Sequence, residues 1–148
     1  MNDLRNKGAL SNYDITKKYE AGIILRGYEV KAILEGKGKL MGSFVKFIKN
    51  EPYLTNFELP LYSKTSKKIE YYPGRERKLL LKKSEINALH KQVKEKGLTI
   101  IPLRIYKKDK FIKVEIALAK GKKRHDKKRD EIEATQKMDL LRMQRDRY

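Results

Sequence analysis

Hydrophobic and polar residues alternate along much of the first 119 positions, a pattern typical of strands with one buried face. From Tyr13 to Leu25, apolar side chains recur at alternate positions over most of the segment. Two β-rich runs within residues 39–59 flank the turn signal Asn50-Glu51-Pro52. The pattern therefore predicts one long strand followed by a hairpin.

Three further strands are predicted later in the chain. A short apolar run covers residues 78–81, and the strands 98–109 and 110–119 adjoin at a turn. The second of these two strands alternates strictly, which predicts one buried face in a curled sheet. Residues 60–76 contain two prolines and no clean period, and they predict a long loop that is functional or mobile.

Two segments have helical rather than strand-like spacing. Residues 84–96 place apolar side chains three and four apart, with Ser84 as the expected N-cap and Gly97 just past the end. Residues 28–34 show the same spacing over a shorter length. Many short strands joined by hairpins, with few helices, favour a small closed antiparallel barrel with flanking helices.

The chain divides into three parts by composition. Residues 1–12 are polar and basic, and they predict a flexible N-terminal arm. Residues 13–119 form the predicted barrel domain, and residues 120–148 lack any strand pattern. In this C-terminal tail, a narrow apolar stripe at helical spacing predicts a segment that is disordered alone and helical when docked.

The charge balance indicates a polyanionic partner. The 148 residues contain 37 Lys and Arg against 19 Asp and Glu, a net charge of +18. No run of about eighteen apolar residues is present, and the beginning of the chain lacks the apolar stretch of a signal peptide. The tail has acidic residues and neither Trp nor Phe, so nucleic acid is favoured over a membrane.

Catalytic and metal-binding chemistry finds little support in the sequence. Cysteine is absent, which excludes disulfides and cysteine-based zinc sites and is compatible with a reducing cytoplasm. The two histidines, His90 and His125, have no clustered carboxylates beside them. No nucleophile or phosphate-loop motif appears. We therefore expect no enzyme activity and no cofactor.

Five ordered segments resemble the SmpB (SsrA-binding protein) family of bacterial trans-translation. YEAGIxLxGxEVK, GLTxIPLxxY and ALAxGKKxHDK are specific in that order. The segments are 6-NKGALSNYDI-15, 19-YEAGIILRGYEVKAI-33, 77-RKLLLKKSEI-86, 95-EKGLTIIPLRIYKK-108 and 114-VEIALAKGKKRHDKKR-129. The resemblance covers most of the chain.

The resemblance implies an OB-fold-like barrel that binds the tRNA-like domain of transfer-messenger RNA. Together with elongation factor Tu, such a protein brings that RNA to stalled ribosomes, and its tail occupies the vacant decoding centre and mRNA channel. It implies a cytoplasmic monomer that performs no bond chemistry. A basic ribosomal-type structural RNA-binding protein is the alternative that composition leaves open, and the motif order favours the first.

The resemblance also implies two sets of contact residues. The expected contacts with transfer-messenger RNA are Asn6, Lys7, Glu29, Lys31, Arg77, Lys78, Leu98, Thr99, Lys113 and Lys120. The expected contacts in the decoding centre and channel are Lys122, Lys123, His125, Asp126, Lys127, Lys128 and Arg129. The chain departs from the family at Lys128, where an arginine is usual and Arg129 follows instead.

Overall fold

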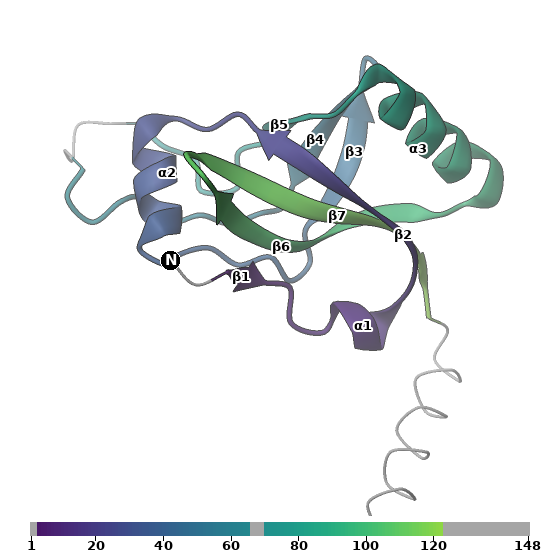
Figure 1. Ribbon diagram of the computed structural model, residues 1–148. Coiled ribbons are helices and arrows are strands. Elements are labelled where there is room, and N and C mark those ends of the chain that lie inside the picture. The colour runs from purple at the N-terminus through teal and green to yellow at the C-terminus, as the bar shows by residue number, and fades with distance from the viewer. Residues whose placement is uncertain (1–2, 66–69, 123–148) are drawn as a thin grey trace, which may run out of the picture.

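The computed structural model describes residues 3–65 and 70–122 (Figure 1). Three helices and seven strands make up this part of the chain. In order they are β1 (Leu4–Arg5), α1 (Ala9–Asn12), β2 (Tyr13–Ile23), α2 (Gly27–Leu34), β3 (Phe44–Ile48), β4 (Glu51–Thr55), β5 (Arg77–Leu80), α3 (Lys83–Lys96), β6 (Thr99–Lys108) and β7 (Phe111–Gly121). The mainly β prediction is therefore confirmed.

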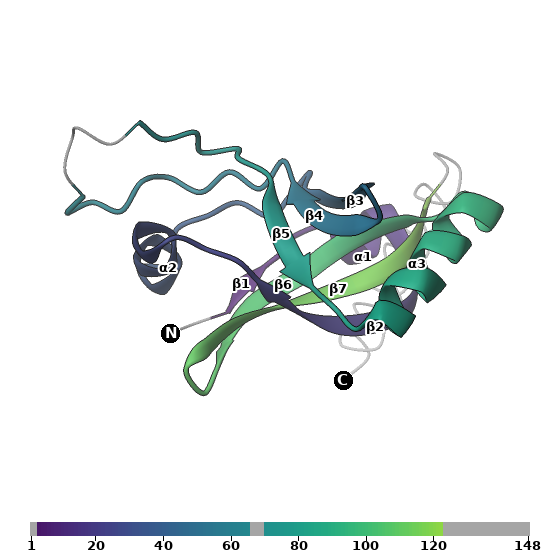
Figure 2. The ribbon, with the colours of Figure 1, turned by 90° about the horizontal axis from the view of Figure 1, so that it is seen from above.

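The strands form one antiparallel sheet that curls into a partial barrel. The order is β1-β6-β3-β4-β5-β2-β7, and β6 also pairs with β7, so the pairings run round a ring. The β2–β7 and β6–β7 ladders are long, whereas β3 meets β6 through the single pair Val45↔Ile100. Figure 2 shows α2 and α3 at opposite ends of this ring.

The hydrophobic core lies inside the ring and beneath the two longer helices. Leu54, Phe57 and Ile116 are fully buried at its centre, together with Ile33 from α2 and Leu89 from α3. Each helix thus contributes its apolar stripe to one end of the core, as expected for an amphipathic helix on a sheet. Polar residues such as Lys31 of α2 and Lys94 of α3 face solvent, whereas Glu29 of α2 is buried.

A β-bulge at Thr16 changes the buried face of β2. The register with β7 shifts between Ile15 and Lys17, which leaves Thr16 as an extra residue. Ile15 packs against a small cluster outside the ring, whereas Tyr19 packs against the main core. The period-two spacing over 13–25 predicted the strand but gave no sign of this change of face, which arises because the extra residue reverses the direction of every side chain after it.

The strand β6 reverses in the same way. Its register with β7 shifts between Pro102 and Arg104. Ile101 belongs to the outer cluster and Ile105 to the main core. Because of these two bulges, β2 and β6 each bury side chains on both faces. The sheet therefore continues beyond the part that forms the ring.

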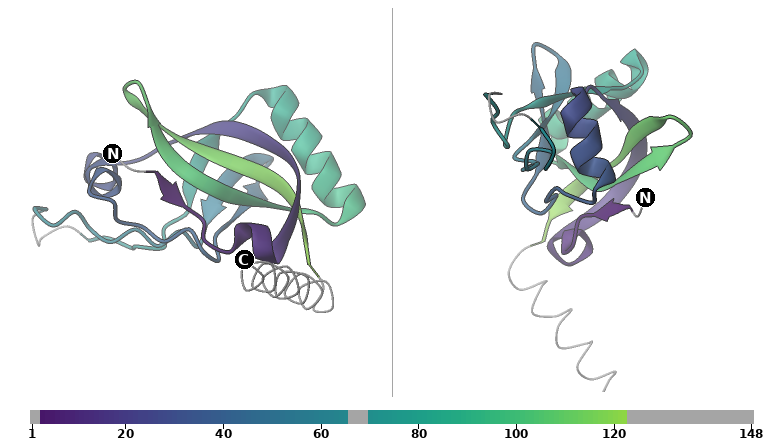
Figure 3. Two further views of the ribbon diagram at one scale, coloured as in Figure 1. Left: turned by 60° about the horizontal axis from the view of Figure 1, so that its bottom comes forward. Right: turned by 90° about the vertical axis from the view of Figure 1, so that its left-hand side faces the viewer.

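The N-terminal arm is paired with the sheet rather than unpaired. Leu4 lies opposite Ile105 in the β1–β6 pairing, and Arg104 donates a hydrogen bond to Asp3 over 3.0 Å. Ala9 of α1 is buried in the outer cluster, and Figure 3 shows β1 and α1 along the flank of the sheet. The expectation of a flexible arm over 1–12 is therefore corrected for the described residues, because the arm covers apolar surface that the bulges expose.

Two local predictions also needed correction. The β3–β4 turn lies at Lys49 and Asn50, both with positive φ, and Pro52 is inside β4 rather than in the turn. The helix α3 begins one residue before Ser84, and the Glu85 carboxylate accepts a hydrogen bond from the Lys82 backbone N–H. The helix therefore begins where the Glu85 carboxylate can cap the Lys82 N–H, and Ser84 is not its N-cap.

Replacing Gly38 by alanine is expected to destabilise the fold. Gly38 has a φ of 120°, and a Cβ there would lie 2.8 Å from two ring atoms of the buried Phe57. Overpacking a core typically costs about 1–3 kcal/mol, and the backbone strain adds to this. Urea unfolding would measure the loss. Gly27→Ala is the matched control, because no atom lies within 4 Å of its Cβ and its φ is ordinary; equal stability of the two variants would contradict the prediction.

Candidate nucleic-acid interface

A buried ion pair joins α2 to β5. Arg77 Nε donates to Glu29 Oε2 over 2.5 Å, and both side chains are fully buried. Arg75 donates to the other carboxylate oxygen, and the Arg26 backbone N–H donates to that same oxygen over 2.9 Å. Glu29 therefore receives hydrogen bonds from three residues, which offset the cost of removing its charge from water.

The guanidinium of Arg77 also fixes the loop that follows β4. Its Nη1 donates to the Phe57 carbonyl over 2.8 Å, and its Nη2 donates to the Tyr71 hydroxyl over 3.0 Å and the Pro73 carbonyl over 3.1 Å. The Leu59 N–H donates to the Pro73 carbonyl over 3.0 Å. The described parts of the predicted long loop are thus held to the body by one buried arginine.

Acid is expected to remove the stability that Glu29 contributes. Burial by itself raises the pKa of Glu29, but the hydrogen bonds from Arg26 and Arg77 and the charge of Arg77 outweigh it, so the pKa lies below its ordinary value. A carboxyl with a lowered folded pKa stabilises above its unfolded pKa, and the contribution is lost as pH falls through the folded value.

The measurement compares wild type with Glu29→Gln by urea unfolding between about pH 7 and pH 3. The stability difference is expected to be largest near neutral pH and to shrink below the ordinary pKa of 4.5. A difference that stays constant across this range would contradict the prediction.

The structure changes the interpretation of two predicted contact residues. Glu29 and Arg77 expose no surface, so neither side chain can touch RNA in this conformation. Asn6 is also turned inward, since its side-chain amide donates to the Pro102 carbonyl over 2.7 Å. The sequence motif marked all three positions, but burial assigns Glu29 and Arg77 to holding the body together, whereas Asn6 is half-buried and also lines a cavity.

The other predicted contact residues on the body lie at or near the surface. Lys7 and Lys120 are exposed, and Leu98 and Thr99 are half-buried. Three more lysines have partners within the described residues. Lys31 lies over the Tyr62 ring, Lys113 lies over the Phe111 ring, and Lys78 forms an ion pair with Glu51 over 2.9 Å. Hydrogen bonding to Glu51 raises the pKa of Lys78.

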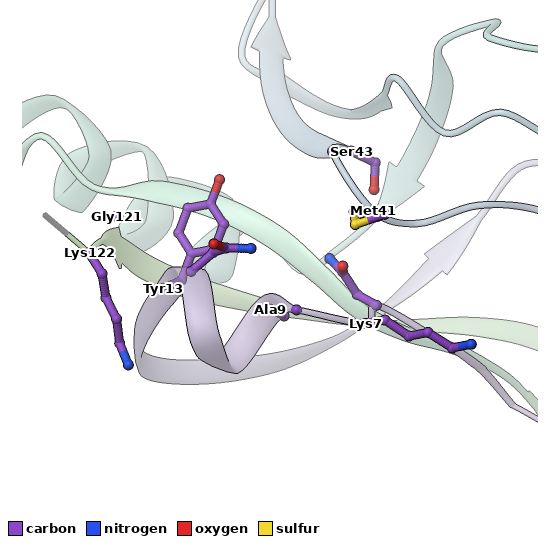
Figure 4. A pocket seen from close by; sticks show the side chains of 11 residues that line it. Lys7, Ala9, Tyr13, Met41, Ser43, Gly121 and Lys122 are labelled. Atoms are coloured by element: carbon purple, nitrogen blue, oxygen red, sulfur yellow. The ribbon is translucent and has the colours of Figure 1, made fainter. Parts of the chain in front are cut away.

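A cavity of about 380 Å³ brings the arm and the beginning of the tail together. Lys7 and Lys122 both line it, and Figure 4 shows them on opposite sides of α1. Tyr13, Met41 and Ser43 are among the other residues that line it. Two lysines from segments 115 positions apart therefore flank one hollow, which suits a phosphate-bearing partner.

The beginning of the tail is attached to the body by the backbone. The strand β7 continues to Gly121, two residues beyond the predicted end of the barrel, and pairs there with Tyr13. The Lys122 N–H donates to the Asn12 carbonyl over 2.9 Å. The predicted decoding-centre residues Lys123, His125, Asp126, Lys127, Lys128 and Arg129 lie outside the described residues.

Two features bear on other classes of site. Over residues 3–65 and 70–122, no group of three or more His, Asp or Glu side chains is placed to hold a metal ion. Within the same part of the chain, no helix is long and apolar enough to cross a membrane. Sequence reasoning missed Arg75 and Tyr71, which complete the network around Arg77. Both residues lie in an irregular loop, where the spacing of polar residues in the sequence does not indicate which side chains form such contacts.

The matching family profile and two relatives with similar sequences carry related descriptions. The sequence profile of the family described as "SmpB protein" matches residues 4–146. An SsrA-binding protein of Persephonella marina is 47% identical over 137 residues, which cover 93% of this chain and 87% of the relative. One from Halothermothrix orenii is 42% identical over 146 residues, covering 97% of this chain and 94% of the relative.

A solved structure is also similar to the fold. It is described as "tmRNA-SmpB: a journey to the center of the bacterial ribosome". The match has a TM-score of 0.68 and 43% sequence identity, and it covers 85% of this chain and 92% of the solved chain. The partial barrel is therefore shared with a protein studied on the bacterial ribosome.

Proposed function

The chain belongs to the SmpB family, and from this premise we propose that it binds transfer-messenger RNA and brings it to stalled ribosomes in trans-translation. The observation that carries the proposal is the likeness to SsrA-binding proteins along nearly the whole chain, 93% of it for the relative from Persephonella marina. The likeness extends to a solved chain described with both transfer-messenger RNA and the ribosome. The net charge of +18 suits an RNA partner.

In this proposal the body and the tail have separate tasks. The partial barrel binds the tRNA-like domain of the RNA, and residues 122–129 enter the vacant decoding centre, with the rest of the tail in the mRNA channel. The protein acts as a cytoplasmic monomer, and elongation factor Tu joins through the RNA. It positions RNA and performs no bond chemistry itself.

The two kinds of predicted RNA-binding residues have different roles in the proposal. Exposed lysines such as Lys7 and Lys120 contact phosphates directly. Glu29 and Arg77 are positioning residues, because Arg77 of the buried pair also holds Phe57, Tyr71 and Pro73 by hydrogen bonds, and with them the surface around α2. A motif that is shared within a family can thus preserve an RNA surface without touching RNA.

Affinity capture from total bacterial RNA tests the proposal. The full chain, immobilised at physiological salt, is expected to enrich transfer-messenger RNA far above its share of the input. Enrichment of ribosomal RNA alone would support the ribosomal-type structural protein and overturn the adaptor. A capture with the Glu29→Gln variant, which carries one more net positive charge than the wild type and is checked for folding by circular dichroism, separates positioning from bulk charge, because weaker capture could not come from lost charge.

A further inference from the structure

We propose that Asn6 is a positioning residue for the C-terminal tail, because it anchors the N-terminal arm and the arm in turn fixes the point where the tail leaves the body. The described part of the arm is residues 3–12, which include β1 and α1. The arm also couples bound RNA to the tail, and this part of the inference rests on the proposed function. The anchoring itself rests on the contacts below.

The arm is attached where β6 has its bulge. Leu103 is the extra residue between Pro102 and Arg104, so it has no partner in the β6–β7 register. Its carbonyl accepts a hydrogen bond from the Asn6 N–H over 2.8 Å, and the Pro102 carbonyl accepts one from the Asn6 side-chain amide over 2.7 Å. A single asparagine therefore binds two carbonyl groups at the bulge.

The one-turn helix α1 connects this anchor to the end of β7. Ala9, its first residue, is buried in the outer cluster together with Ala119 of β7. Asn12, its last residue, accepts the hydrogen bond from the Lys122 N–H over 2.9 Å. Because the second contact needs α1 to lie against the sheet, undocking of the arm would break the bond that holds Lys122 to the body.

The docked arm depends on few contacts, so a ligand can shift its equilibrium. The strand β1 has two residues and the helix α1 has four, and segments this short are not stable alone. Gly8 precedes α1 with a φ of 89°, a conformation that is unfavourable for other residues. Segments of this kind open locally far more often than a buried core does.

RNA is expected to favour the docked arm. Lys7 and Lys122 line one hollow that the arm and the body form together (Figure 4). A phosphate held by both lysines would bind the docked state in preference to the undocked one, and this difference in affinity shifts the equilibrium. RNA bound at Lys7 should therefore hold Lys122 in place, and by linkage a fixed Lys122 should favour RNA binding.

The test measures backbone amide hydrogen exchange of the full chain by NMR in wild type, Gly8→Val and the control Leu10→Val. A β-branched residue is strained at the positive φ of Gly8, whereas the Leu10 side chain is 73% exposed. We expect Gly8→Val to speed exchange at the Lys122 amide by about tenfold. Exchange at the Ile116 amide, in the middle of β7, should change much less, and Leu10→Val should change neither.

A second variant acts on the anchor itself. Asn6→Ala removes the side-chain hydrogen bond to Pro102 and should also speed exchange at Lys122. Unchanged exchange at Lys122 in both Gly8→Val and Asn6→Ala would overturn the positioning role. Equal acceleration at Lys122 and Ile116 would overturn it as well, because the arm would then only support the global fold.

The coupling to RNA is measured by adding the isolated tRNA-like domain at saturating concentration. Exchange at Lys122 should slow by at least about fivefold, and the Asn6 amide should slow with it, because both report the docked arm. Slowing at Lys122 alone, or no slowing at either amide, would overturn the coupling. Failure of the proposed function is a distinct result, in which the wild-type chain does not prefer the tRNA-like domain over an unstructured RNA of equal length.

Discussion

Ending the chain after Lys122 is expected to abolish peptide transfer to transfer-messenger RNA on stalled ribosomes, while affinity for its tRNA-like domain changes by no more than about twofold. Residues 123–148 contain nine Lys and Arg against six Asp and Glu, a net charge of +3. Residues 1–122 therefore keep +15 of the +18. The cut also preserves β7 and the Lys122–Asn12 hydrogen bond, so the body should fold unchanged.

The measurement pairs a single-turnover rescue assay with an RNA-binding titration on the same preparation. A chain with residues 123–148 in scrambled order serves as the control, because it has the same charge without the HDK motif. It should bind RNA normally and fail to rescue. If the truncated chain lost RNA affinity in proportion to rescue, the proposed separation of tasks would be wrong.

Removing one partner of the buried ion pair is expected to cost the most stability of any single substitution considered. Arg77→Met leaves the Glu29 carboxylate in the interior with two donor residues instead of three and releases four oxygen acceptors of Arg77. Breaking a buried pair from one side typically costs about 3–5 kcal/mol. Urea unfolding of the variant at neutral pH gives this loss directly.

Two controls make the interpretation specific. Lys78→Met, one residue along β5, removes a surface ion pair with Glu51 and should change stability little. The double variant Glu29→Met/Arg77→Met removes both charges and should be more stable than Arg77→Met alone. If the double variant were less stable than the single one, unpaired charge would not be the cause.

Local patterns predicted most of the strands because a strand that buries one face leaves a period of two in the sequence. They could not predict the bulges in β2 and β6. In β2, Ile15 and Tyr19 are both apolar residues at odd-numbered positions, although the inserted residue makes them face opposite sides. Only the pairing partner across the sheet reveals the change.

The interface was predictable in part for a related reason. Exposed lysines contribute through charge, which composition already reveals, and Lys7 and Lys120 lie on the surface as expected. Glu29 and Arg77 are 48 positions apart, and nothing local distinguishes a buried arginine from a solvated one. Charged residues are rarely fully buried unless they are paired, so the residue type alone predicts that they lie on the surface.

The hydrogen bond from the Lys122 N–H to the Asn12 carbonyl fixes the position of Lys122 on the body. His125 follows three residues later, so its Cα cannot lie more than roughly 11 Å from the Cα of Lys122. A tether of this length raises the effective concentration of the histidine at any site the body has already reached. Inserting flexible residues between Lys122 and His125 would lower this effective concentration without changing the contacts of the body.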